Sequence, residues 1–195
     1  NVIAHVPEIN DFIKGLKILL NFDGIITLEF PHLLQLIKNL QFDTIYHEHV
    51  FYFSLFTIQK IFVIHGLEVF NVEEISTHGG SLRIFVKHAE NIKIKIEESV
   101  SEIIKKEMES GLGNISTYDI FNNKVSEIKA DIISFFVNAK KEKKKIVCYG
   151  AAAKGNTLLN YCHIGNEFVE FSVDRNTFKH GLYLPGIHIP ILPVE

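Results

Sequence analysis

The sequence predicts an α/β protein in which a helical connector joins two parts that each contain helices and strands. The first part combines apolar residues at helical spacing with short apolar runs typical of strands. The middle segment spaces its apolar residues three and then four apart among lysines and glutamates, as amphipathic helices do. The last part has the order strand, glycine-containing turn, helix and strand, which predicts a βαβ unit with parallel strands.

In the first part, residues 8–20 place apolar side chains at helical spacing, and a turn signal follows at Asn21–Gly24. The run GIITLEF then predicts a buried strand. A second helix is expected from about Leu55 to Ile64, with its end at Gly66. The runs LEVFNVEEI and SLRIFVKHA predict two strands on either side of a turn at Thr77–Gly80, so this part ends in a hairpin.

Two amphipathic helices are expected on either side of a hinge at Gly111–Gly113. The charged run Lys140–Lys145 indicates a solvated helix end, with a phosphate-attracting patch as the alternative. After this run, IVCYG predicts a buried strand, AAAKGNT a turn, LLNYC a helix and FVEFSVD a second strand. A segment rich in proline and glycine follows (LYLPGIHIPILP).

Composition favours a folded protein that acts on a small molecule. The 195 residues are 47% hydrophobic, and 20 basic against 23 acidic residues give a net charge of −3, so neither nucleic acid nor a membrane surface is an expected partner. The sequence has no apolar run long enough for a transmembrane helix and no basic leader. With two cysteines it fits a reducing, cytoplasmic setting. Because the chain lacks an initiator Met and stops inside an apolar stretch, we expect a fragment of a longer protein.

The motif YHEH, Tyr46–His49, places a phenol, two imidazoles and a carboxylate together. A metal site is disfavoured, because two histidines at i and i+2 lack the i, i+4 spacing of helical ligands and no thiolate completes the shell. The structural alternative is that these are half-buried polar side chains whose hydrogen bonds are satisfied by the backbone. The functional alternative is proton removal from carbon beside a ketone, with His49 as base, Tyr46 as donor to the enolate and Glu48 as the acid that orients the ring.

The segment GAAAKGNT, Gly150–Thr157, has neither the Walker A order nor the full GxGxxG pattern. It predicts a small-residue turn that directs backbone N–H groups and Lys154 at an anion, against the alternative of a merely tight turn. The residues Asp174–Asn176 follow the next strand and are expected at the same sheet edge.

The turn THGGS has two open interpretations. It is either a hairpin turn in which glycine accepts positive φ, or a bare backbone that a substrate approaches, with Arg83 as an anion partner.

Six segments together resemble the sugar C-methyltransferases: NVIAHVPEINDF, GIITLEFPHL, QFDTIYHEHVFYFS, THGGSLRIFV, VCYGAAAKGNTLLNYC and VDRNTFKHGLYLPG. These enzymes use S-adenosylmethionine to methylate a ring carbon of a nucleotide-linked ketosugar. The resemblance covers nearly the whole chain, and the YHEH and GAAAKGNT blocks in this order carry it.

The resemblance implies three regions. Residues 1–90 would be the second half of a Rossmann-like methyltransferase domain with the YHEH motif, 91–142 a helical connector, and 143–195 part of a Rossmann-like C-terminal domain that binds the nucleotide-sugar. The family's N-terminal zinc-binding domain and the main glycine loop for S-adenosylmethionine are not within this sequence. Zinc is therefore expected only in that domain, and no metal in this chain.

The resemblance also implies residue roles. His49 is the expected base, with Tyr46 and Glu48 beside it, and His5 matches a second active-site histidine. The cofactor pocket is expected to involve Asn1, Ala4 and His5. Substrate-binding residues are expected to be Ser54, Gly79, Gly80, Arg83, Lys154, Asn156 and Arg175, the last three toward the diphosphate or base. Phe51 departs from the small polar residue expected there.

Two other functions compete with this one. A non-catalytic nucleotide-sugar-binding remnant of such an enzyme is the first alternative. A sugar-nucleotide dehydrogenase or epimerase fragment is the second, but it requires a nicotinamide fingerprint that the sequence does not show.

Overall fold

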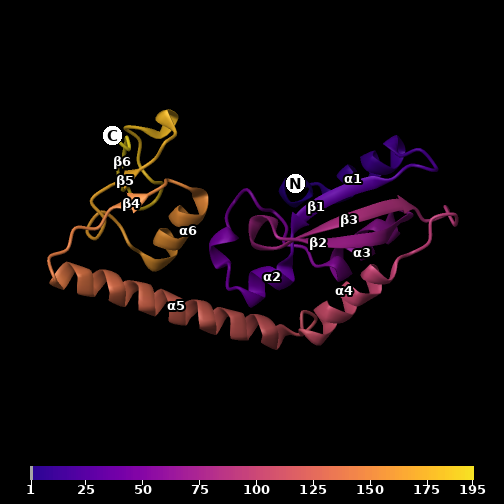
Figure 1. The fold of residues 1–195 in the computed structure, drawn as a ribbon, viewed down its shortest axis with the longest axis horizontal. Helices are drawn as coiled ribbons and strands as arrows, with labels where there is room; N and C mark the ends of the chain where they lie inside the picture. The colour runs from indigo at the N-terminus through magenta and orange to yellow at the C-terminus, as the bar shows by residue number, and fades with distance from the viewer. Residues whose placement is uncertain (1) are drawn as a thin grey trace. The chain divides into compact units, whose positions relative to one another are not determined.

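The computed structural model describes residues 2–195, which form two compact units (Figure 1). The first unit holds the residues up to Gln41 together with His47–Tyr118, and the second holds Phe42–Tyr46 with Asp119–Glu195. Both units combine helices and strands, so the predicted α/β class is confirmed.

The first unit is built on a three-stranded antiparallel sheet of β1 (Ile26–Pro31), β2 (Leu67–Ile75) and β3 (Ser81–His88). The strand order is β1-β3-β2, so the predicted hairpin of β2 and β3 is confirmed. The strand β1 is at the edge, and Phe30 is its buried residue. The expectation of a buried GIITLEF strand is therefore wrong, because an edge strand has a ladder partner on one side only.

Four helices belong to this unit: α1 (Ile9–Leu19), α2 (Leu33–Lys38), α3 (Leu55–Ile64) and α4 (Glu98–Glu109). Short 3-10 turns occur at Ile3–His5 (η1) and Thr77–Gly79 (η3). The helices α1 and α3 match their predicted ranges, whereas α2 was not predicted, since its short apolar run LLQLI has no clear helical period. The core is shared by the sheet, α1, α3 and α4, and includes Ile13, Ile58, Phe62, Ile84, Val100 and Ile103.

Two helices flank the glycine hinge, as predicted. The helix α4 ends at Glu109, Gly111 has a φ of +78°, and α5 runs over Ile115–Lys141. Because Val100 and Ile103 of α4 pack in the first core, α4 is a structural part of the first unit. The domain boundaries at residues 90 and 142 remain predictions.

The second unit contains a parallel sheet of three short strands, β4 (Cys148–Tyr149), β5 (Ser172–Val173) and β6 (Ile191–Leu192), in the order β4-β5-β6. The predicted βαβ unit is confirmed, with α6 (Ala153–Cys162) as its helix. The strand β6 was not predicted, because it lies within the Pro- and Gly-rich segment. Buried residues of this core are Leu159, Cys162, Ile164, Val169, Leu184, Ile189 and Ile191.

Two details of this unit correct the sequence prediction. The run IVCYG is not a buried strand: β4 is an edge strand, and Tyr149 is 67% exposed. The predicted AAAKGNT turn is shorter than expected, because α6 begins at Ala153 and includes Lys154, Gly155 and Asn156. Alanines are strong helix formers, which explains the earlier start.

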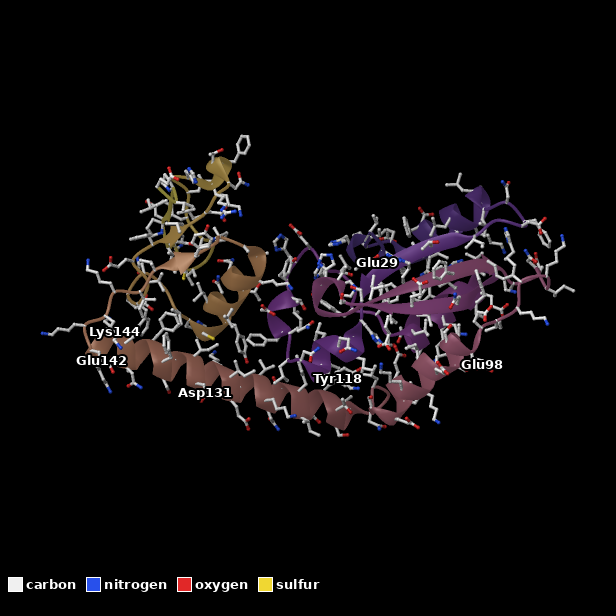
Figure 2. All side chains as sticks on the ribbon, in the orientation of Figure 1. Glu29, Glu98, Tyr118, Asp131, Glu142 and Lys144 are labelled. Carbon is white, nitrogen blue, oxygen red and sulfur yellow. The ribbon has the colours of Figure 1, made fainter. Side chains whose placement is uncertain are left out.

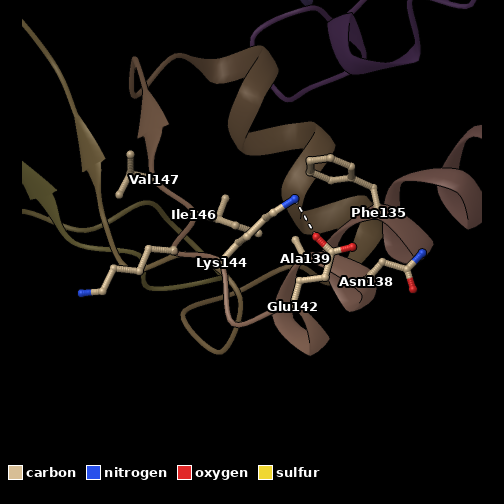
Figure 3. Close-up of a pocket in the computed structure, with 8 residues that line it drawn as sticks. Phe135, Asn138, Ala139, Glu142, Lys144, Ile146 and Val147 are labelled. Atoms are coloured by element: carbon tan, nitrogen blue, oxygen red, sulfur yellow. Dashed lines mark ion pairs between the residues drawn. The ribbon is translucent and has the colours of Figure 1, made fainter.

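The charged run at the end of α5 is solvent-exposed, as predicted. Lys144 pairs with Glu142 at 2.6 Å, and Lys145 pairs with Glu170 at 3.5 Å. Figure 3 shows the Glu142–Lys144 pair at the rim of a pocket of about 460 Å³, where Phe135 and Ile146 supply apolar surface. Because these lysines have acidic partners, the structure favours a solvated helix end over a phosphate-binding patch. Within residues 2–195, no helix is both long and apolar enough to cross a membrane.

Candidate functional site

The structure brings His5 and His49 together. Their ring centroids are 4.9 Å apart, and the rings are tilted by 56°. His5 Nδ1 lies 2.7 Å from the carbonyl oxygen of Glu48. Since a carbonyl only accepts, Nδ1 must be the donor, and in a neutral ring Nε2 is then left as an acceptor. The ring of His49 also meets Tyr52 edge-on, with centroids 6.0 Å apart.

Main-chain hydrogen bonds hold the segment that carries His49. The carbonyl of Ala4, in η1, accepts from the N–H groups of Val50 and Phe51 at 2.9 and 3.2 Å. Further along, the carbonyl of Phe53 accepts from Leu33 at 2.9 Å, and Phe53 forms a parallel bridge with His32. His49 is therefore on an irregular segment, residues 47–53, which we call the His49 segment. Its two ends are tied to η1 and to the start of α2.

The residues just before this segment group with the second unit. Phe42–Thr44 forms a 3-10 turn (η2), and the ring of Phe42 contacts Tyr161 of α6 with centroids 5.1 Å apart. Tyr46 is grouped there too, whereas Glu48 and His49 are grouped with the first unit.

Ser54 has a structural role in the fold. It is the N-cap of α3, and its hydroxyl accepts from the N–H of Thr57 at 3.1 Å and donates to Thr57 Oγ1 at 2.9 Å. It is 4% exposed, so a substrate would reach little of it. Its role in substrate binding stays a prediction.

The two glycines of the THGGS turn have positive φ, +82° at Gly79 and +114° at Gly80. The space beside them is filled by the protein itself. A Cβ added at Gly79 would meet the Gln41 amide, and one at Gly80 would lie 2.6 Å from Gln35 Cγ. The amide of Gln41 also donates to the Gly79 carbonyl at 3.0 Å. The turn conformation explains these glycines without a ligand.

Arg83 lies between two carboxylates on the sheet. Its guanidinium is 3.3 Å from Glu29 of β1, which Figure 2 labels, and 3.3 Å from Glu73 of β2. With two acidic partners in place, an anionic substrate would have to compete for this arginine. The interpretation of Arg83 as a ready anion partner is thus weakened.

In the second unit, Asp174 directly follows β5, and its carboxylate reaches the turn that follows β4. Its Oδ2 accepts from the Ala151 N–H at 2.7 Å and from Lys179 Nζ at 3.3 Å, and its Oδ1 accepts from the Asn176 N–H at 2.8 Å. These bonds, led by the backbone N–H groups of Asn176 and Ala151, lower the pKa of Asp174 to about 2. The Ala151 N–H of the glycine turn is therefore used by a carboxylate of the protein.

The beginning of α6 remains available to an anion. Its N-cap is Ala152, which forms no side-chain cap, and Lys154 is exposed in its first turn. Uncapped N–H groups at a helix start carry partial positive charge. Arg175 is exposed at the end of β5, and its Nε donates to the Tyr149 hydroxyl at 3.2 Å.

A largely apolar pocket of about 510 Å³ lies between α5, β4 and α6. Its apolar lining includes Phe136, Leu159 and Leu184, and Asn156 contributes a polar side chain. Gly150 and Gly155 also line it, and an added Cβ at either would meet no atom within 4 Å. Of the three residues assigned to the nucleotide, Asn156 thus lines this pocket.

The other predicted cofactor residues are described in part. Asn1 lies outside the described residues. Ala4 is 4% exposed, so it offers little more than backbone surface, whereas His5 is exposed. Among residues 2–195, no group of three His, Cys, Asp or Glu side chains is arranged to hold a metal ion.

Sequence reasoning missed several residues that shape these sites. Lys179 donates to both Ala151 O, at 2.8 Å, and Asp174. Glu107 is buried beside the end of the His49 segment, where it accepts from Leu55 and Phe56. The place of Asp174 directly after a predicted strand was a usable sequence signal for the cluster that it forms with Lys179. An amphipathic-helix pattern, in contrast, gives no sign that Glu107 faces inward.

Comparison with known proteins agrees with the resemblance. The family model for the C-methyltransferase C-terminal domain matches residues 76–195. Over 192 residues, or 98% of the chain, the sequence is 36% identical to the C-methyltransferase NovU of Streptomyces niveus. The match covers 46% of that protein, so the chain spans about half the length of this curated relative.

Proposed function

Because the chain belongs to the C-methyltransferase family, we propose that it serves in the S-adenosylmethionine-dependent methylation of a carbon atom in a nucleotide-linked ketosugar. The observation that carries this proposal is the pairing of His5 and His49, with centroids 4.9 Å apart. Two imidazoles side by side, on backbone held by main-chain hydrogen bonds, suit proton transfer better than they suit packing.

In the proposed reaction, His49 removes the proton from the carbon next to the ketone. The electrons of that C–H bond form the enolate, and negative charge develops on the keto oxygen. Tyr46, three residues earlier, is proposed to donate a hydrogen bond to this oxygen, and Glu48 to orient the imidazole. When bound, S-adenosylmethionine supplies the electrophilic methyl group that the enolate carbon receives.

Ala4 and His5 are the described residues that would face the methyl donor. The Ala4 carbonyl already accepts from Val50 and Phe51, so this residue would contribute shape and His5 polarity. Three hydrogen bonds tie η1 to the His49 segment. They would hold His5 and His49 in place beside a ligand bound there. In-line placement of the reacting carbon beside His49 would then supply much of the catalysis.

The second unit is proposed to bind the nucleotide end of the substrate. The apolar pocket beside Gly150 and Gly155 is large enough for a base, and Asn156 could fix its orientation. The start of α6 with Lys154, together with Arg175, would attract the diphosphate. Because Asp174 already occupies the Ala151 N–H, the diphosphate is expected at α6 and not in the glycine turn itself.

The decisive experiment separates proton removal from binding. A full-length enzyme containing these residues is given a nucleoside-diphosphate ketosugar in D₂O, and deuterium uptake next to the ketone is measured by NMR. His49→Asn should lower this exchange and methyl transfer roughly 10²- to 10⁴-fold while nucleotide-sugar affinity persists. A matched control is His163→Asn, because His163 is exposed, has a φ of +55° that Asn tolerates, and has no role in the mechanism.

Full activity in His49→Asn would refute the mechanism. Nucleotide-sugar binding by the wild-type enzyme without exchange or methyl transfer would instead favour the binding remnant.

A further inference from the structure

A fully buried carboxylate lies beside the segment that carries His49. Glu107 of α4 is 0% exposed, and its Oε1 is 2.7 Å from His32 Nε2 and 2.6 Å from the Leu55 N–H. Its Oε2 accepts from the Phe56 N–H at 2.9 Å. Leu55 and Phe56 are the first residues of α3, so Glu107 satisfies two N–H groups at that helix start. Three donors around one carboxylate match the acceptor capacity of its ionised form.

The partner His32 is 1% exposed, and its second ring nitrogen, Nδ1, has no hydrogen-bond partner among the described residues. The geometry fits the tautomer with its proton on Nε2, directed at Glu107.

All three partners of Glu107 are linked to the His49 segment. His32 bridges to Phe53, and its neighbour Leu33 donates to the Phe53 carbonyl at 2.9 Å. Leu55 and Phe56 follow Phe53 in the chain with only Ser54 between them. Glu107 therefore anchors the distal end of the segment, whereas Ala4 and His5 anchor the end near His49.

Stability by itself does not account for this buried hydrogen-bonded pair of Glu107 and His32, since well-packed apolar side chains often serve equally well or better. What the carboxylate adds is direction, because it fixes three donors at defined positions. We propose that Glu107 is a positioning residue for His49, acting through His32 and the first turn of α3. This inference rests on the proposed function of His49.

The test compares Glu107→Gln with Glu109→Gln in the full-length enzyme. Gln keeps the shape of Glu but presents an N–H₂ group to at least one donor, so the segment loses its fixed end. Glu109 is a matched control, because it lies on the same helix with an exposed side chain. We expect kcat and deuterium exchange of the ketosugar to fall roughly 10- to 100-fold in Glu107→Gln, as small misplacements of reacting groups do, with KM unchanged.

The assays are run well below the unfolding temperature of each variant, which circular dichroism determines. A folded Glu107→Gln protein with the kcat and exchange rate of Glu109→Gln would overturn the proposal. If Glu107→Gln does not fold, His32→Gln and His32→Phe replace it. Gln retains a donor near the position of Nε2 and should keep most of the activity, whereas Phe should lose it, and equal activity of the two would overturn the proposal.

Failure of the proposed function has a different signature. If the wild-type enzyme neither exchanges nor methylates, the role of His49 is refuted, but positioning is still measurable through hydrogen exchange of the Val50 and Phe51 amides. Faster exchange of these amides in Glu107→Gln than in Glu109→Gln supports the anchor. Equal exchange overturns it.

Discussion

His5 donates a hydrogen bond from Nδ1 to the carbonyl oxygen of Glu48 while its ring lies beside that of His49, with centroids 4.9 Å apart. One side chain thus fixes the backbone next to the proposed base and also contacts the base itself. The bond uses the main chain of Glu48, so the Glu48 carboxylate is not needed for it.

This relationship predicts distinct outcomes for two His5 variants. His5→Phe keeps a ring beside His49 but loses the bond to Glu48, and it should lower deuterium exchange of the ketosugar by roughly tenfold or more. His5→Asn places an amide N–H near the position of Nδ1 and should retain more of the exchange rate. Exchange in His5→Phe equal to wild type would show that the bond does not position the base.

Asp174 should make the second unit sensitive to acid. Its folded pKa of about 2 is below the ordinary value of 3.8, so its contribution to stability is full above about pH 4 and is lost as the pH falls toward 2. Asp174→Asn should therefore be less stable than wild type at neutral pH, and the difference should vanish near pH 2. Denaturant titrations across this range test it, with the exposed residue Asp131 of α5, as Asp131→Asn, for the control (Figure 2). A difference independent of pH would contradict the assignment.

Ser54→Ala should reduce stability through loss of the α3 N-cap. The lost bond to the Thr57 N–H predicts a cost of about 1 kcal/mol in the free energy of unfolding, measured by denaturant titration. Ser126→Ala, at an exposed position on α5, should change it by less than about 0.5 kcal/mol. If Ser54→Ala left stability unchanged but weakened nucleotide-sugar binding, the substrate role inferred from the sequence would replace the structural one.

Lys154→Ala and Arg175→Ala should each weaken binding of a nucleoside diphosphate by about 1.5–3 kcal/mol, the range for a charged hydrogen bond. Isothermal titration calorimetry measures this, with the exposed Lys124→Ala on α5 as the control. Unchanged nucleotide affinity together with loss of S-adenosylmethionine binding would mean that the two units have been assigned to the wrong ligands.

The periodicity of apolar residues was enough to predict α1, α3, the β2–β3 hairpin and the two helices around Gly111. These elements have long, regular patterns, so local spacing specifies them. The prediction failed where elements are short: α2 has six residues and β6 two, and both depend on partners distant in sequence. The early start of α6 was hidden because alanine, lysine and glycine suit either a turn or a helix start.

The YHEH motif by itself indicated proton chemistry, and the resemblance indicated His5, but only the tertiary structure placed their rings together. Contact between residues so far apart along the chain depends on how η1 docks against the His49 segment, and no local pattern encodes that docking. The same holds for Glu107 with His32 and for Gln41 with Gly79. The sequence thus determined the residue types and regular elements, whereas packing decided which polar groups meet, because burial leaves each of them to find its hydrogen-bond partner wherever the fold brings one within reach.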